Sequence, residues 1–226
     1  MSGQTAEITW RDGQLPMSVR FNDPYYSMND GLAESRFVYL SGNDLPAQFR
    51  PGFHIGELGF GTGLNMLAAW RAWLDAGIDG PLRFTSFEAY PMASDDMKRA
   101  LQSFPELADL ATEFLSRWSP GRRDIELPGL VLDVIIGDAR ERVPNWNAHA
   151  DAWFLDGFAP VRNPELWGHS LLRDVATHTT PGGTFATYTA AGSVRRALSD
   201  AGFAVQRIPG FAGKRHMTTG RLDKPE

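Results

Sequence analysis

The sequence predicts an α/β fold with a mostly parallel, seven-stranded sheet, a C-terminal antiparallel strand and a small N-terminal β-hairpin extension. Three observations lead to this prediction. Beyond residue 51, short β-prone runs alternate with helix-forming segments; a glycine-rich turn follows the first run; and two β-prone runs joined by a Pro-Gly turn lie near the C-terminus. Alternating strands and helices are typical of a parallel sheet that helices cover.

The predicted core begins after Arg50-Pro51-Gly52. Strands are expected at residues 53–58, 82–87, 131–136, 152–155, 184–188, 203–208 and 216–222. Helices are expected at residues 64–76, 93–102, 105–118, 164–177 and 193–201. Pro181-Gly182-Gly183 should introduce the strand at 184–188, and the last two strands should pair around a turn at 209–214.

The first fifty residues carry a different pattern. Two short β-prone pieces, at 17–21 and 36–40, are separated by the turn signals Asn22-Asp23-Pro24 and Asn29-Asp30-Gly31. We therefore expect an N-terminal extension at 1–50 that packs on a single core domain at 51–226.

Composition narrows the class of protein. The chain has 226 residues, of which 42% are hydrophobic, and this is typical of one globular domain with a full core. It has no cysteine, which excludes disulfides, thiolate zinc sites and thiol nucleophiles within the chain. The five histidines lack the spacing of metal ligands, so we expect no metal. The N-terminus does not resemble a signal peptide and no run could span a membrane, so we expect a cytoplasmic protein without a membrane partner.

Charge is distributed unevenly along the chain. The net charge is −5, yet the segment 190–226 has seven basic and three acidic residues, so it carries +4 and the remainder −9. A net negative charge argues weakly against a nucleic-acid partner. The basic segment is either ordinary solvated surface or a rim that faces an anionic substrate.

The glycine turn is the strongest chemical signal. It reads Glu57-Leu58-Gly59-Phe60-Gly61-Thr62-Gly63, an acid at a strand end followed by G-x-G-x-G before a helix. Such glycines let a ligand lie against bare backbone. Leu64 departs from the G-x-G-x-x-G dinucleotide fingerprint, and the Gly-Lys-Ser/Thr of a P-loop is absent. S-adenosylmethionine, with its ammonium and sulfonium groups, suits an acid beside the turn; a generic glycine turn is the alternative.

Acids also follow the next strands. Glu88 comes 29 residues after Gly59, where an acid accepts hydrogen bonds from ribose hydroxyls in such folds; Asp138 would lie by the adenine, and Asp156 at the fourth strand end. In open α/β sheets ligands bind beyond the carboxyl ends of the strands. Each acid alone could be a helix N-cap. Their recurrence at successive strand ends favours a ligand site.

The segment Asp156-Gly157-Phe158-Ala159-Pro160 is where a methyl donor should meet its acceptor. Asp156 could orient an amine and assist its deprotonation, while Phe158 and Pro160 could form an apolar wall against a base. Phe158 could equally be an ordinary core aromatic.

These motifs together resemble one family. Gly59 to Asn65, Ser86 to Glu88 and Asp151 to Pro160 resemble the methyltransferase domain of the tRNA 5-methylaminomethyl-2-thiouridine biosynthesis family, MnmC and its standalone counterpart MnmD. Asp30 to Arg36, Asn163-Pro164, Pro181 to Thr184, Val194 to Arg196 and Gly210 to Arg215 resemble further blocks, so the likeness spans about residues 20–222.

The resemblance implies a Rossmann-like class I methyltransferase that N-methylates the 5-aminomethyl group of (2-thio)uridine at the tRNA wobble position. It implies that the donor is bound by Glu57, Gly59, Phe60, Gly61, Thr62, Gly63, Asn65, Glu88 and Asp138, and that Asp156 lies at the amine. Arg195, Arg196, Lys214 and Arg215 would contact phosphates in the anticodon region of tRNA. Bifunctional members carry an oxidase domain that this chain lacks, so we expect a separate oxidase to supply the aminomethyl intermediate.

Two other functions remain open on the sequence alone. One is an S-adenosylmethionine-dependent N-methyltransferase for a small-molecule or protein amine, which would have the same fold and show no dependence on RNA. The other is a noncatalytic binding module with a decayed pocket, which four intact strand-end acids argue against.

Overall fold

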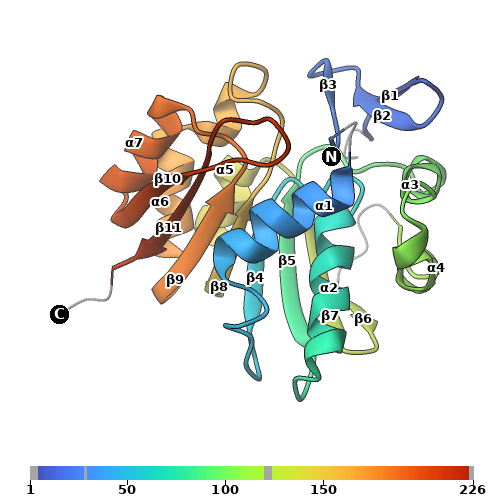
Figure 1. Cartoon of the computed structure of the whole chain (residues 1–226), viewed down its shortest axis with the longest axis horizontal. Helices are drawn as coiled ribbons and strands as arrows, with labels where there is room; N and C mark the ends of the chain where they lie inside the picture. Colours follow the sequence, from blue (N-terminus) through green and yellow to red (C-terminus); the bar gives the residue numbers. More distant parts are fainter. Residues whose placement is uncertain (1–4, 28–29, 120–123, 224–226) are drawn as a thin grey trace.

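The computed structural model describes residues 5–27, 30–119 and 124–223, and its centre is an eight-stranded sheet (Figure 1). Its strands are β4 (His54–Leu58), β5 (Leu82–Glu88), β6 (Ile125–Leu127), β7 (Leu130–Ile136), β8 (Ala150–Leu155), β9 (Thr179–Thr187), β10 (Phe203–Ile208) and β11 (Met217–Leu222). Their order across the sheet is β10-β11-β9-β8-β4-β5-β7-β6. Asn29 of the N-terminal turn signal and Lys224 of the basic segment lie outside the described residues.

The sheet is parallel in its middle and antiparallel at its two edges. β9, β8, β4, β5 and β7 are parallel neighbours, whereas β10, β11 and β6 pair antiparallel. All seven predicted strands are present, and the C-terminal antiparallel pair is confirmed. The eighth strand, β6, was not predicted; it has three residues and turns back into β7 through Pro128-Gly129, where Gly129 has a φ of 75°.

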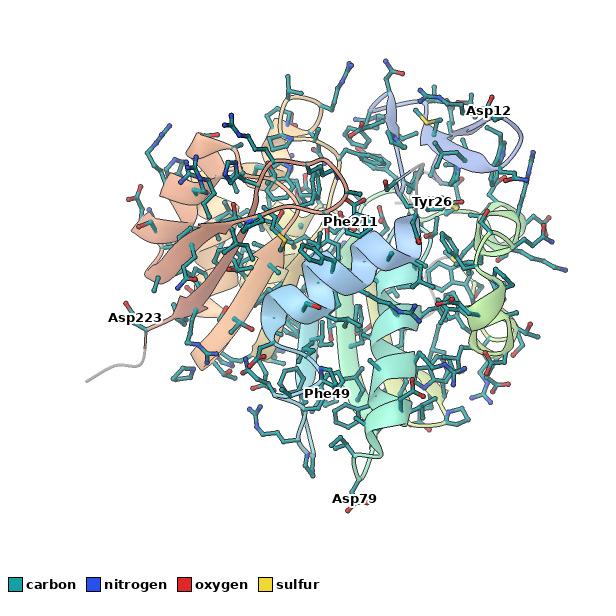
Figure 2. All side chains as sticks on the ribbon, in the orientation of Figure 1. Asp12, Tyr26, Phe49, Asp79, Phe211 and Asp223 are labelled. Carbon is teal, nitrogen blue, oxygen red and sulfur yellow. The ribbon has the colours of Figure 1, made fainter. Side chains whose placement is uncertain are left out.

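Helices cover both faces of the sheet. They are α2 (Leu64–Ala76), α3 (Ser94–Leu101), α4 (Ala108–Leu115), α5 (Ala139–Arg142), α6 (His169–Thr177) and α7 (Gly192–Asp200). Buried residues of α2, α3 and α4 belong to one hydrophobic cluster and those of α5, α6 and α7 to a second. Adjacent strand residues alternate between the clusters, as Phe154 and Trp153 do in β8, because successive side chains of a strand point to opposite faces. Side chains fill the space between sheet and helices (Figure 2).

The N-terminal segment forms a small sheet and then a helical segment. Strands β1 (Ile8–Arg11), β2 (Leu15–Ser18) and β3 (Asp23–Pro24) make a three-stranded antiparallel sheet, so the predicted hairpin is confirmed. Helix α1 (Gly31–Ser35) follows, then a π-helical stretch η1 (Arg36–Leu40) and a 3-10 turn η2 (Ser41–Asn43). In Figure 1 this helical segment crosses in front of the main sheet.

The prediction of β structure at residues 36–40 was wrong, because this stretch is helical. Asp30 caps α1 by accepting a 2.8 Å hydrogen bond from the Ala33 N–H, and η1 continues the helix with Val38, Tyr39 and Leu40 buried. A short apolar run has no periodicity that separates a buried helix from a strand. These residues share the buried cluster of the main sheet, and the expected boundary at residue 50 stays a prediction.

Two predicted helices are interrupted and one turn is displaced. The segment 105–118 is a 3-10 turn η3 (Pro105–Leu107) followed by α4, and 164–177 is a 3-10 turn η5 (Pro164–Trp167) followed by α6 after Gly168. Pro181-Gly182-Gly183 lies inside β9 instead of before it, because a register shift against β8 accommodates the extra residues. No helix in the described ranges has the length and apolar character needed to cross a membrane.

Candidate active site

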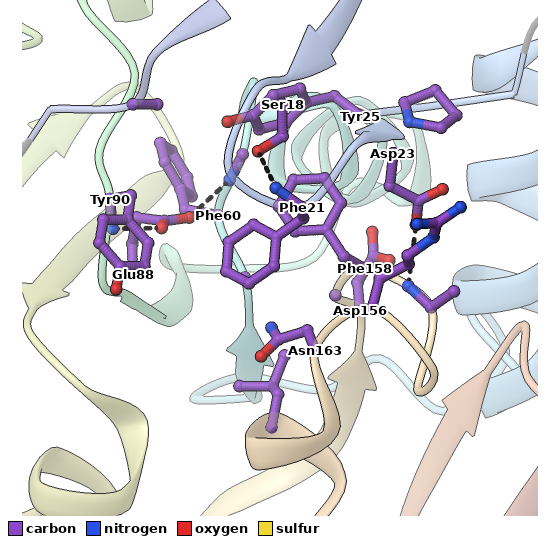
Figure 3. A pocket seen from close by; sticks show the side chains of 18 of the residues that line it. Ser18, Phe21, Asp23, Tyr25, Phe60, Glu88, Tyr90, Asp156, Phe158 and Asn163 are labelled. Carbon is purple, nitrogen blue, oxygen red and sulfur yellow. Dashed lines mark hydrogen bonds between the residues drawn. The ribbon is translucent and has the colours of Figure 1, made fainter.

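A cavity of about 1360 Å³ opens at the carboxyl ends of the central strands. Its walls come from the glycine turn after β4, the ends of β5 and β8, the start of α5, the N-terminal sheet and helix α1. Small-molecule sites typically occupy roughly 300–1,000 Å³. This cavity therefore has room for more than one small ligand (Figure 3).

The glycine turn brings bare backbone to the cavity. Gly59, Gly61 and Gly63 all have positive φ, at 89°, 53° and 77°. A Cβ on Gly59 would lie 2.5 Å from the backbone oxygen of Asp156, so a side chain here would push the turn away from the end of β8. Gly59, Phe60, Gly61 and Thr62 line the cavity, whereas Gly63 lies behind them as the N-cap residue of α2.

Glu88 holds the glycine turn in place. Its Oε2 accepts a 3.0 Å hydrogen bond from the Gly61 N–H and its Oε1 accepts one of 2.7 Å from the Tyr90 N–H (Figure 3). The backbone N–H groups of Phe60 and Ala89 also act on this carboxylate, and Glu88 lines the cavity. Burial raises the pKa of Glu88, and the backbone hydrogen bonds oppose that rise.

Glu57 lies beneath the cavity and not in its wall. It is fully buried, accepting hydrogen bonds of 2.7 Å from the Ser86 hydroxyl and 3.1 Å from the Asn65 amide. Burial raises its pKa well above the usual range, and the Ser86 hydrogen bond opposes this rise. Glu57 is not in the cavity lining and is connected to it through Asn65, and a contact between Glu57 and a ligand stays a prediction.

Asn65 and Asp156 complete this network. The Asn65 amide donates to Asp156 Oδ2 at 2.8 Å, and its own oxygen accepts a 2.6 Å hydrogen bond from the Ser35 hydroxyl of α1. Both side chains line the cavity. Burial raises the pKa of Asp156 to about 6, hydrogen bonds from Tyr39 and Asn65 oppose this, and the charge of Glu34 adds to it. A carboxylate with such a pKa is ionised at neutral pH and is suited to accept a proton from an amine.

Asp138 lines the cavity but already has two structural partners. It is the N-cap of α5, accepting a 2.9 Å hydrogen bond from the Arg140 N–H, and its carboxylate makes a bidentate ion pair with the Arg140 guanidinium at 3.0 Å and 2.6 Å. The Arg140 hydrogen bond lowers the pKa of Asp138. The N-cap alternative therefore holds for Asp138, and a contact with adenine stays a prediction.

The N-terminal sheet forms a wall of the cavity, which sequence reasoning did not anticipate. Phe21 stacks on Phe158 with ring centroids 4.7 Å apart, and Tyr25 meets the edge of the same ring at 5.1 Å. Asp23 accepts a 2.9 Å hydrogen bond from the Ala159 N–H, so the loop after β8 is tied to the extension (Figure 3). The aromatic residues near position 21 were the available signal.

The predicted substrate residues divide into two groups. Phe158 and Lys214 line the cavity, and Lys214 Nζ lies 2.5 Å from Glu34 Oε1. The others lie outside its lining: Pro160, Arg195, Arg196 and Arg215. Arg196 and Arg215 are exposed and Arg195 is partly buried, so they are placed for contacts on the surface.

The cavity fits a charged nucleoside such as S-adenosylmethionine. Three conditions are met: a turn with three glycines, an acid (Glu88) in the cavity lining, and a second acid (Asp156) near the turn. The described residues contain no group of three or more histidine or carboxylate side chains that could hold a metal ion.

Comparisons with known proteins also point to a methyltransferase. Residues 104–223 match the model of a family described as S-adenosyl-L-methionine-dependent methyltransferase. The chain is 44% identical, over 99% of its length, to the tRNA 5-methylaminomethyl-2-thiouridine biosynthesis bifunctional protein MnmC of Marinobacter nauticus, of which it covers 37%. It is 44% identical over 95% of its length to the MnmC of a Caulobacter species, of which it covers 38%. The chain thus spans little more than a third of these curated relatives.

Solved structures support the fold. A crystal structure of MNMC2 from Aquifex aeolicus matches with a TM-score of 0.77 and 26% identity, covering 99% of this chain and 72% of that one. Spermidine synthase from Thermotoga maritima matches with a TM-score of 0.54 and 12% identity, covering 98% and 73%, which speaks for the fold alone. The Rossmann-like α/β arrangement expected from the sequence is confirmed.

Proposed function

Because the chain belongs to the S-adenosyl-L-methionine-dependent methyltransferase family, we propose that it N-methylates the 5-aminomethyl group of (2-thio)uridine at the tRNA wobble position. The methyl donor is S-adenosylmethionine. The relatives are named tRNA 5-methylaminomethyl-2-thiouridine biosynthesis bifunctional proteins, and the chain spans little more than a third of the length of each. The acceptor is therefore the proposed part.

One observation carries the proposal: Asn65 holds the Asp156 carboxylate at 2.8 Å, in a cavity that also contains the glycine turn. Methyl transfer to nitrogen is an in-line displacement, and most of the rate comes from placing the amine lone pair near the methyl carbon in a dry site. Asp156 accepts an N–H of the amine and so directs the lone pair. Its ionised form can also receive the proton that an ammonium must lose before attack.

The proposed donor contacts follow from the cavity lining. Gly59, Phe60, Gly61 and Thr62 present the turn to the donor, the Glu88 carboxylate is proposed to accept from ribose hydroxyls, and Asp138 lies at the start of α5. Asn65 lines the same space. Glu57 and Gly63 shape the site from behind.

The proposed RNA contacts include Phe158 of the cavity lining and arginines outside that lining. Phe158, stacked on Phe21, offers an aromatic face to the target base. Arg195, Arg196 and Arg215 are proposed to contact phosphates, with Lys214 as a fourth cation, and Pro160 is proposed to extend the apolar wall of Phe158. A separate oxidase that supplies the amine, and a cytoplasmic location, belong to the same proposal.

The test is methyl transfer from methyl-labelled S-adenosylmethionine to tRNA that carries 5-aminomethyl-2-thiouridine, followed by nucleoside analysis. We expect label in the methylaminomethyl nucleoside, and none in tRNA whose wobble uridine is unmodified. Transfer to a small-molecule or protein amine, insensitive to ribonuclease and to salt, would replace the tRNA proposal. A chain that binds neither the donor nor S-adenosylhomocysteine in calorimetry would be a noncatalytic module.

A further inference from the structure

A second carboxylate, Glu34, lies at the acceptor end of the cavity. It belongs to α1, lines the cavity together with Asp156, and its side chain is only 12% exposed. The next residue, Ser35, donates to Asn65 at 2.6 Å, which anchors α1 to the same network that holds Asp156. Glu34 is therefore held next to this network, although the chemistry described above does not use it.

The Glu34 carboxylate already holds an ammonium group. Lys214 Nζ lies 2.5 Å from its Oε1 and 4.7 Å from the centre of the Tyr188 ring. The Tyr188 hydroxyl donates to the Gly157 backbone oxygen at 2.7 Å, which fixes the ring. A carboxylate and an aromatic face together make a favourable site for a primary ammonium.

Lys214 comes from the segment between β10 and β11 and is 45% exposed. Phe211 of this segment contacts Phe37 with ring centroids 5.7 Å apart, which brings the segment over the helical part of the N-terminal region (Figure 2). The Lys214 side chain is partly in solvent, so its ammonium can leave Glu34 for water. Another ammonium group can then take its place beside Glu34.

We propose that Glu34 and the Tyr188 ring bind the ammonium form of the acceptor's aminomethyl group, and that Lys214 occupies this position until the acceptor arrives. The inference rests on the proposed function and adds a residue that selects an amine over other groups at the same carbon. Alkylamines have a pKa near that of lysine, about 10.4, so the acceptor arrives as a cation.

The chemical step then balances. Asp156 takes one N–H proton, which leaves a neutral amine with a lone pair. That pair forms the N–C bond to the donor's methyl carbon, and the electrons of the broken C–S bond stay on sulfur. The product is a secondary ammonium and Asp156 returns its proton to water. Glu34 remains a carboxylate throughout, and the displaced Lys214 is free to meet a phosphate of the same RNA.

The experiment compares two nucleosides that differ only at the reacting group, 5-aminomethyluridine and 5-hydroxymethyluridine. Their binding to the chain saturated with S-adenosylhomocysteine is measured by ligand-observed NMR. We expect the wild type to prefer the amine by about tenfold, and Glu34→Gln, which keeps shape but removes charge, to bring the ratio near one. Lys214→Gln should raise amine affinity a few-fold, because the competing ammonium is gone.

The matched control is Glu106→Gln, which breaks a 2.5 Å ion pair between Glu106 and Arg36. Both side chains are exposed and neither residue lines the cavity. It should leave the ratio unchanged. Unaltered affinity for S-adenosylhomocysteine in Glu34→Gln shows that the variant is folded.

An amine preference that survives in Glu34→Gln, or that is absent from the wild type, overturns the inference. Lower amine affinity in Lys214→Gln overturns the occupancy by Lys214. The proposed function is tested separately. If the wild-type chain methylates tRNA but does not prefer the amine nucleoside, only the Glu34 inference is contradicted. If the preference depends on Glu34 but tRNA is not methylated, only the tRNA assignment is contradicted.

Discussion

Asn65 donates a 2.8 Å hydrogen bond to the carboxylate of Asp156. Asn65 is the second residue of α2, directly after the glycine turn, and Asp156 follows the end of β8. The same amide also donates to the buried Glu57 at 3.1 Å. The turn that we propose for the donor and the acid that we propose for the acceptor are thus one connected unit.

Replacing Asp156 should separate catalysis from donor binding. In Asp156→Ala we expect turnover on tRNA to fall by a factor on the order of 100 or more, because the amine loses its orienting acceptor. Affinity for S-adenosylmethionine, measured by calorimetry, should stay within a few-fold. Turnover at the wild-type rate would remove Asp156 from the mechanism.

The pH profile should report the same carboxylate. Burial raises the pKa of Asp156 to about 6, so the group is ionised above that pH and protonated below it. We expect kcat/KM of the wild type to fall about tenfold per pH unit below about pH 6. Asp156→Asn should lose this limb of the profile; an unchanged limb in that variant assigns it to another group.

Stability should respond to pH with the opposite sign. The folded-state pKa of Asp156 is raised from 3.8 to about 6, so its contribution to stability is complete below about pH 4 and is lost as the pH rises through about 6. Asp156→Asn should therefore be more stable than the wild type at pH 8, by about 1–3 kcal/mol, and equal to it near pH 4. Urea unfolding at both pH values measures this, and an equal difference at both would contradict it.

The glycine turn can be tested with a pair of substitutions. Gly59→Ala places a Cβ 2.5 Å from the Asp156 backbone oxygen at a φ of 89°, so it should weaken binding of S-adenosylhomocysteine by tenfold or more. Gly80→Ala has a similar φ of 78° but open space around its Cβ. This control carries backbone strain without the clash, and its ligand affinity should match the wild type. Equal losses in both variants would point to strain alone.

The arginines outside the cavity should affect RNA and not the donor. Replacing Arg195 and Arg215 with glutamine should raise the KM for tRNA and reduce the salt dependence of binding, by roughly 0.7–0.9 in log–log slope per lost phosphate contact. Arg50→Gln is the control. Arg50 makes an ion pair with Asp151 at 2.6 Å and precedes β4, so it lies at the amino ends of the strands, away from the cavity. Similar KM changes in the control would indicate a general charge effect.

Much of this arrangement could be predicted from the sequence, since it depends on local patterns. The strand-helix alternation and the acids after successive strands gave the parallel sheet and the edge at which Glu88 and Asp156 lie. The helix predicted at residues 64–76 has the same bounds in the structure, Leu64–Ala76, because a glycine flanks each end, Gly63 and Gly77.

What was missed depends on contacts between segments far apart in the chain. The stacking of Phe21 on Phe158 and the pairing of Glu34 with Lys214 join residues that no local pattern relates. The full burial of Glu57 also depends on packing that no local pattern shows, and β6 is too short to stand out.

The most direct test of the account is a crystal structure of the chain with S-adenosylhomocysteine. We predict that the nucleoside lies along Gly59 to Thr62 with its ribose hydroxyls on the Glu88 carboxylate, and that its sulfur points to the end of β8 beside Asp156. A nucleoside bound elsewhere on the chain, with the glycine turn closed by protein side chains, would contradict it.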